Sequence, residues 1–143
     1  LFNTLIENGV TPCGLAARDT LRIEFGLPLY GQELSEEIHP LMTRYKWVVK
    51  FDENFIGKDA LLKLKQQDHL HAVGLELSEP LIARPNYKIT EGGFVSSGTL
   101  SPVTSKSIAL AFVPKKYREI GSRLNVEIRK NSIAAHVVKV PFL

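Results

Sequence analysis

The second half of this sequence consists of short apolar segments separated by residues typical of turns. Six such segments follow His69, at 72–77, 87–90, 94–97, 108–113, 124–129 and 133–140. Between them lie Gly92-Gly93, Ser101-Pro102 and Gly121. Segments this short and evenly spaced, with no helical pattern between them, predict a closed antiparallel β-barrel, because closure leaves no strand edge unpaired. We expect no helix longer than about two turns after residue 70.

The clearest strand pattern lies at 124–129. Leu124, Val126 and Ile128 alternate there with polar or charged residues. Since side chains of a strand point alternately to its two faces, this segment presents one face to a core and the other to solvent.

The first 68 residues have a more helical pattern. Leu1, Phe2, Leu5 and Ile6 form an apolar stripe at helical spacing. No capping residue precedes the stripe, so we expect the chain to begin inside an element and to be a fragment of a larger protein. The apolar face of this part, in which we include Ile23, would then be exposed or covered by self-association.

Two arginines lie in the segment 14–33. Arg18 and Arg22 are four residues apart and share one face if the segment is helical, although the apolar spacing by itself also permits a strand. Gly26 and Pro28 are typical of a helix end, so we predict a helix that ends near residue 25. On residue types alone, arginines on such a helix would form solvated ion pairs.

The middle of the chain has a mixed pattern. Residues 34–47 predict a short helical turn and an irregular stretch, because Pro40 interrupts them. The β-branched and aromatic residues at 47–51 predict a strand, and the leucines and lysines at 56–65 predict a helix.

Three ordered parts of the sequence resemble the aminomethyltransferases, the T-proteins of the glycine cleavage system. The first is the run from Cys13 to Glu33, which contains the triplet Ala17-Arg18-Asp19. The second is the tryptophan segment with Phe55-Ile56-Gly57-Lys58 after it. The third comprises 93–102, 106–113 and the terminal 135–142. The resemblance runs along the whole chain but covers only the carboxy-terminal part of the family's architecture.

The resemblance implies an α+β fold, with a partial α+β folate-binding domain followed by a small antiparallel β-barrel. Residues 1–68 would be the carboxy-terminal part of the central folate-binding domain, and residues 69–143 the T-protein carboxy-terminal β-barrel domain. The implied activity of the full-length enzyme is transfer of a methylene unit from the aminomethyl-dihydrolipoyl arm of the H-protein to tetrahydrofolate, with release of ammonia. The family's catalytic aspartate belongs to the part that this chain does not match. We therefore expect no catalytic residue here and no activity from the chain alone.

The resemblance also points to individual residues. Arg18 occupies the arginine of the family's Ala-Arg-Asp triplet, a folate-binding position, and a guanidinium can hold the carboxylates of the folate tail bidentately. Trp47 is a weaker candidate, since its indole could pack on the pteridine ring or in a core. Arg84 matches a family arginine with either a site role or a structural one. We expect Arg22 to form an ion pair with a neighbouring acid.

Composition argues against several other classes. The net charge of +3 is mild, and we interpret the densest basic run, 115–118, as a solvated turn and not a nucleic-acid stripe. Cys13 is the only cysteine, which excludes an internal disulfide and a multi-thiolate metal site. The four histidines have no metal-ligand spacing, and no apolar run is long enough to span a bilayer. The resemblance implies tetrahydrofolate and the H-protein as partners, with no metal, nucleic acid or membrane. It also implies a cytoplasmic location in a bacterium or the mitochondrial matrix in a eukaryote.

Two other interpretations stay open at this point. One is the folate-binding module of a dimethylglycine or sarcosine dehydrogenase-like enzyme, or a non-enzymatic folate-binding relative, since the same modules recur there. The other is a small barrel that binds nucleic acid or protein. The barrel strands lack an exposed pattern of aromatic and basic residues, which argues against nucleic acid.

Overall fold

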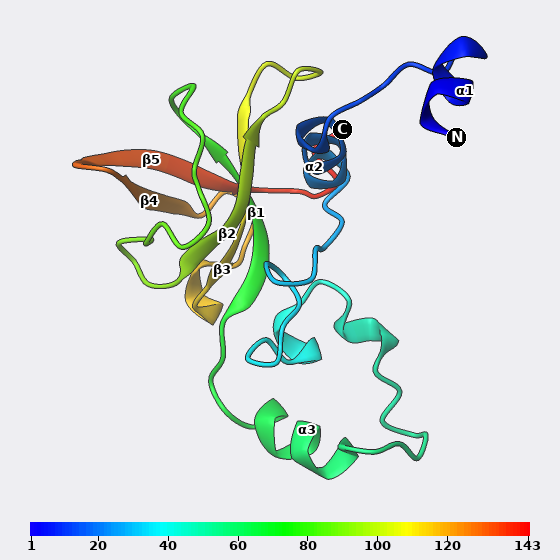
Figure 1. Cartoon of the computed structure of the whole chain (residues 1–143). Helices are drawn as coiled ribbons and strands as arrows, with labels where there is room; N and C mark the ends of the chain where they lie inside the picture. The colour runs from blue at the N-terminus through cyan, green and yellow to red at the C-terminus, as the bar shows by residue number, and fades with distance from the viewer.

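A computed structural model describes all residues from 1 to 143 (Figure 1). The helices are α1 (Phe2–Glu7), α2 (Leu15–Glu24) and α3 (Lys58–Lys65), with 3-10 turns η1 (Pro40–Met42), η2 (Lys46–Val48) and η3 (Lys115–Tyr117). The strands are β1 (His71–Leu77), β2 (Phe94–Leu100), β3 (Ser107–Val113), β4 (Arg123–Ile128) and β5 (Asn131–Val138). Helices thus precede the sheet in the chain, and the fold is α+β, as the sequence predicts.

The five strands form one curled antiparallel sheet in the order β2-β3-β1-β5-β4. The extended segment 86–90 joins the two outer strands. On one side Asn86 N donates to Val95 O at 2.8 Å, and on the other Glu127 N donates to Lys88 O at 2.9 Å. This segment therefore closes the barrel, although the strand predicted at 87–90 is reduced to isolated bridges.

The barrel encloses the core. The main cluster consists of fifteen buried apolar residues, which come from all five strands and include Ala83 and Ile89 from the connection before β2. Leu124, Val126 and Ile128 all point into it, which confirms the predicted alternation of β4. Every residue of β3 is buried, because the core lies on one of its faces and α2 packs on the other near one end.

The strand predicted at 47–51 is wrong. Val48 N donates to Tyr45 O at 2.9 Å and closes the 3-10 turn η2, after which the chain turns again. Trp47 is 69% exposed, so of the two positions open to its indole, the core is not the one that it occupies. A strand needs a partner edge, and the barrel uses its own edges for closure, so β propensity alone does not produce a strand here.

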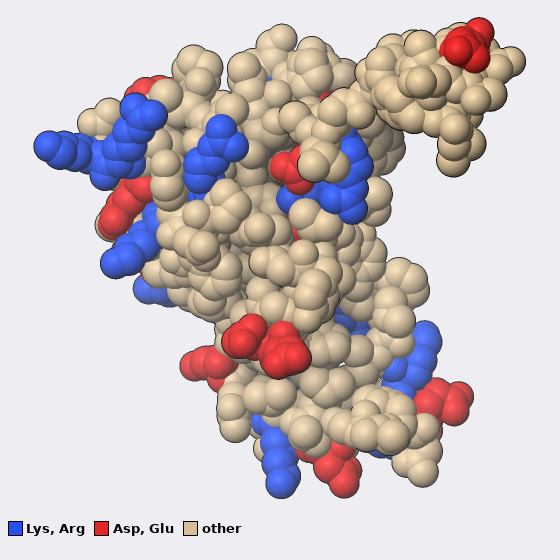
Figure 2. Space-filling view, in the orientation of Figure 1, with Lys and Arg blue, Asp and Glu red and all other residues tan.

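Helix α1 lies apart from the rest of the molecule. Figure 2 shows it as a separate lobe, mostly without charged side chains on the visible face. No residue of α1 is buried, and Leu1 and Phe2 are 96% and 68% exposed. The sequence predicts that Ile23 shares the exposed apolar face, but it belongs to α2 and is fully buried. None of the helices is long and apolar enough to cross a membrane.

Candidate functional site

The candidate site is built on α2, which carries the Ala-Arg-Asp triplet near its amino-terminal end. Gly14 precedes the first helical residue, and Gly26, with φ of +66°, follows the last turn. Gly26 N donates to Ile23 O at 2.8 Å and Leu27 N to Arg22 O at 2.7 Å, which together satisfy two terminal carbonyl groups. A left-handed residue at this position favours glycine, so the helix ends where the sequence predicts.

Arg22 is buried in a network of ion pairs. Its Nε donates to Asp19 Oδ1 at 2.7 Å, one terminal nitrogen donates to Glu33 Oε2 at 2.9 Å, and the other to Ser97 Oγ at 2.7 Å. Glu33 Oε2 also accepts from Leu29 N at 3.0 Å. Arg22 is 8% exposed, and its guanidinium has protein partners on every nitrogen. It therefore has a structural role, in agreement with the ion pair expected for it.

Hydroxyl groups of the barrel bind the inner side of α2. Besides Ser97, Thr99 pairs with Thr20 through their hydroxyls at 3.0 Å, and Ser101 Oγ donates to Glu24 Oε1 at 2.5 Å. These three residues occupy alternate positions along and just beyond β2, so they share one face of the strand. This segment belongs to the family motif at 93–102, but no local pattern in the sequence predicts partners for its hydroxyls.

The end of the chain and an earlier loop hold the carboxy-terminal end of α2. Phe142 N donates to Glu24 O at 2.9 Å. The guanidinium of Arg44 donates to Gly26 O at 3.2 Å and to Val140 O at 2.7 Å. Helix α2 is thus fixed both to the second strand and to the segment that follows the last strand, and its orientation cannot change without breaking these bonds.

Arg18 lies on the exposed side of this fixed helix. Its side chain is exposed, and it forms no ion pair and no hydrogen bond with any other side chain. Arg22, one turn further along α2, is instead buried and bonded to the protein through every guanidinium nitrogen. Arg18 therefore offers all five guanidinium donors to a ligand or a partner at a position that the barrel holds rigid.

Trp47 and Arg84 lie on other elements. Trp47 belongs to η2, and Arg84 is exposed in the connection between β1 and the segment 86–90. Arg84 O accepts a hydrogen bond from Tyr87 N at 3.2 Å, but the Arg84 side chain forms no ion pair. No hydrogen bond joins Arg18, Trp47 and Arg84 to one another. No group of three His, Cys, Asp or Glu side chains is arranged to hold a metal ion.

Known proteins share both halves of this arrangement. The family model described as the glycine cleavage T-protein C-terminal barrel domain matches residues 71–143, and that of the GCVT N-terminal domain matches residues 1–53. The aminomethyltransferase of Aquifex aeolicus is 47% identical over 92% of this chain, and that of Synechococcus elongatus is 46% identical over 99%. A crystal structure of glycine cleavage system aminomethyltransferase T from Bartonella henselae superimposes with a TM-score of 0.86 over 97% of this chain, at 30% identity.

The chain has an α+β fold in which α2, with its two arginines, is attached through β2 to a carboxy-terminal β-barrel. This is the class of fold that the matched barrel domain and the solved structure share. The chain belongs to the glycine cleavage T-protein family. It spans only 38% to 41% of the length of the relatives named above. The fold class and the family expected from the sequence are therefore confirmed.

Proposed function

We propose that this chain acts as the carboxy-terminal part of an aminomethyltransferase. In that role it would take part in transferring a methylene unit from the aminomethyl-dihydrolipoyl arm of the H-protein to tetrahydrofolate, with release of ammonia. The observation that carries the proposal is the alignment of nearly the whole chain with proteins named aminomethyltransferase, together with a solved structure of the same name. The tetrahydrofolate substrate, the H-protein partner and a cytoplasmic location in a bacterium belong to this proposal.

The division of the chain is part of the same proposal. Residues 1–68 would complete the folate-binding domain, and residues 69–143 would form the terminal barrel. The division is supported by the limits of the two family models, since one match ends at residue 53 and the other begins at residue 71. The catalytic carboxylate would come from a part of the enzyme outside this sequence, so no residue here takes that role.

Arg18 would bind the folate tail. Its guanidinium is exposed and unpaired, whereas the contacts of Arg22, Thr20 and Glu24 hold the helix that carries it. A fixed cation loses little conformational freedom when it binds a carboxylate, and an arginine can bind it through two parallel hydrogen bonds. Trp47 and Arg84 would be secondary contacts, one with the pteridine ring and the other with polar groups of the ligand.

The chemistry of the transfer requires chiefly that two substrates meet in the right geometry and away from water. In this proposal the chain forms one rigid side of the site in which the two substrates meet. The barrel positions α2, and α2 positions Arg18, so the folate nitrogen that accepts the carbon would be held at a constant place relative to the lipoyl arm.

The activity is tested on the complete gene product with lipoylated H-protein that carries the aminomethyl group. We expect formation of methylenetetrahydrofolate and ammonia in equal amounts. A product that binds folate without this reaction would favour the non-enzymatic relative. A product that oxidises dimethylglycine or sarcosine with a flavin would favour the dehydrogenase-like enzyme.

The role of Arg18 is tested by folate titration of the Arg18→Lys variant of the same protein. We expect tetrahydrofolate affinity to fall roughly tenfold to a hundredfold, the equivalent of about 1.5 to 3 kcal/mol for a hydrogen bond to a charged group. Arg123→Lys on β4 is the matched control, since Arg123 is also exposed. An unchanged dissociation constant for Arg18→Lys, in a protein that melts like the parent, would remove the assignment without contradicting the activity.

A further inference from the structure

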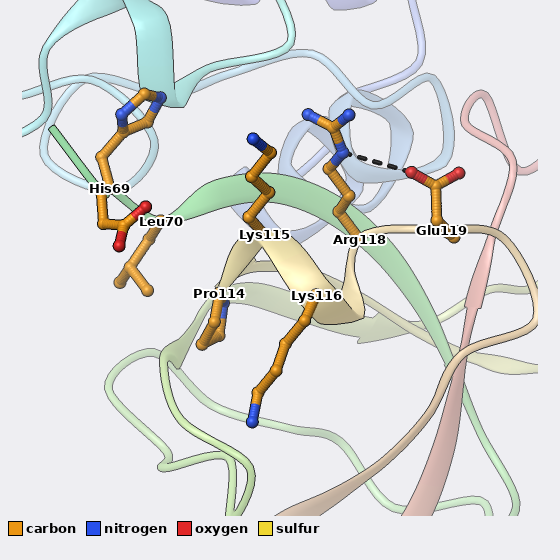
Figure 3. A pocket seen from close by; sticks show the side chains of 8 residues that line it. His69, Leu70, Pro114, Lys115, Lys116, Arg118 and Glu119 are labelled. Carbon is orange, nitrogen blue, oxygen red and sulfur yellow. Dashed lines mark hydrogen bonds and ion pairs between the residues drawn. The ribbon is translucent and has the colours of Figure 1, made fainter. Parts of the chain in front are cut away.

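Two adjoining cavities lie next to the start of β1 and the η3 loop, and none of their lining residues belongs to α2. They have volumes of about 750 and 270 Å³ and share four lining residues, Asp68, His69, Lys115 and Arg118. Figure 3 shows the larger cavity, with His69 at the start of β1 on one side and the residues of η3 on the other. Lys115 and Arg118 extend toward the same side as His69, whereas Lys116 points away.

The lining of these cavities is strongly basic. Five cationic side chains from α3, η2 and the η3 loop contribute to it: Lys46, Lys65, Lys115, Lys116 and Arg118. Only two acidic side chains accompany them, and Glu119 is already paired with Arg118 at 3.2 Å. Neither Lys46 nor Lys115 has an ion-pair partner. Apart from Lys116, the cations thus come from separate elements to the same cavities, where Asp68 and Glu119 compensate only part of their charge.

Three histidines lie beside these cations, although they are distant in sequence. The ring of His69 lies 5.1 Å from that of His39 and 4.6 Å from that of His71, measured between centroids. Nδ1 of His39 is buried and has no hydrogen-bond partner. Burial lowers the pKa of His71 to about 4, with further lowering from the nearby positive charges. The charged groups around His71 are His69, Arg118, Lys46, Lys115, Lys65 and Asp68.

We propose that these cavities bind a compact anion with two or more negative charges, either a tetrahedral oxyanion or a small polycarboxylate. Like charges that are only partly compensated raise the energy of the free protein, and a multivalent anion reduces that repulsion. The cavities are open to solvent, and their cations come from several elements, so an anion bound there could contact more than one of them at once. Arg118 offers a planar guanidinium and Lys115 a mobile ammonium group to the oxygens of the anion. This inference does not depend on the folate role of Arg18.

The first experiment is a sulfate titration of the 143-residue chain at constant ionic strength, followed through the histidine ring resonances in NMR spectra. Sulfate keeps two charges across the accessible pH range, and citrate serves as the polycarboxylate probe. We expect saturable shifts of the His69 and His71 resonances. We also expect the pKa of His71 to rise from about 4 toward its ordinary value, because a bound anion stabilises the imidazolium. Binding should therefore strengthen as the pH falls.

The double variant Lys115→Gln/Arg118→Gln tests the residues. Its affinity for sulfate should fall roughly tenfold or more. The matched control, Lys88→Gln/Lys130→Gln, removes the same charge from exposed positions outside both cavities and should bind like the parent. Saturation by sulfate alone or by citrate alone tells which ligand class the site takes. Shifts that sodium chloride reproduces at equal ionic strength, or an equal loss in both variants, would overturn the proposal.

Discussion

Arg18 and Arg22 lie one turn apart on α2, and their surroundings give them different roles. Arg22 is buried against Glu33 and Ser97, whereas Arg18 has no protein partner. Removing one partner from a buried charge pair costs far more than changing an exposed charge. A test of the ligand role therefore belongs at Arg18, because a change at Arg22 would mix binding with stability.

The bond between Ser101 and Glu24 gives a second residue-scale prediction. Ser101→Ala leaves the fully buried Glu24 carboxyl group without a partner. We expect the free energy of unfolding to fall by about 1.5 to 3 kcal/mol, measured by urea denaturation. Ser107→Ala is the control, since Ser107 is also buried but its hydroxyl has no partner, and its stability should change little. Equal losses in both variants would contradict the role of this bond.

The pKa of His71 predicts how stability depends on pH. That pKa is about 4 in the folded chain and 6.5 in the unfolded reference, so the unfolded state binds more protons between these values. Stability should therefore be complete above pH 6.5 and should fall as the pH drops to about 4. The part due to His71 should be on the order of 1 to 2 kcal/mol after solvent screening.

Denaturation at several pH values in chloride buffer measures this dependence. His71→Gln should flatten the curve between pH 6.5 and 4. His136→Gln, at an exposed position on β5, should leave it as in the parent. A curve that is the same for His71→Gln and the parent would show that His71 does not titrate as described.

At the scale of elements, the segment 86–90 decides whether the sheet is open or closed. It has too few regular hydrogen bonds to count as a strand, yet it bonds to β2 on one side and β4 on the other. Ile89 also points into the core cluster. Closure therefore depends on one short connection as much as on the five strands.

Ile89→Ala tests this closure. We expect a loss of about 2 to 5 kcal/mol in the free energy of unfolding, because the truncated side chain leaves a cavity between the two edges. Ile120→Ala removes the same atoms from an exposed position and should change stability by less than about 0.5 kcal/mol. Chemical denaturation of both variants gives the comparison. A small loss for Ile89→Ala would mean that the connection does not hold the barrel together.

At the scale of the whole molecule, apolar side chains gather on α1 and on the region around η2. Leu1, Phe2, Trp47 and Ile56 are among the most exposed apolar residues of the chain. Exposed apolar side chains in such numbers promote association in water.

We therefore expect the 143-residue chain to self-associate with rising concentration, as measured by sedimentation velocity. Phe2→Ser/Leu5→Ser should reduce the association, because both residues lie on the unburied helix α1. Ile120→Ser, a single exposed position elsewhere, should have little effect. A parent chain that stays monomeric and binds no apolar dye would contradict this prediction.

The sequence by itself determined the features that depend on neighbouring residues. The alternation of β4, the end of α2 at Gly26 and the strand series after His69 follow from patterns within a few positions. Only the tertiary structure decided which arginine is buried and what closes the barrel. Thr20 and Thr99 are 79 positions apart, and Glu24 and Ser101 are 77 apart, so no local pattern could pair them. The segment at Trp47 has strand propensity but no strand to pair with, and a strand forms only when another edge supplies its hydrogen bonds.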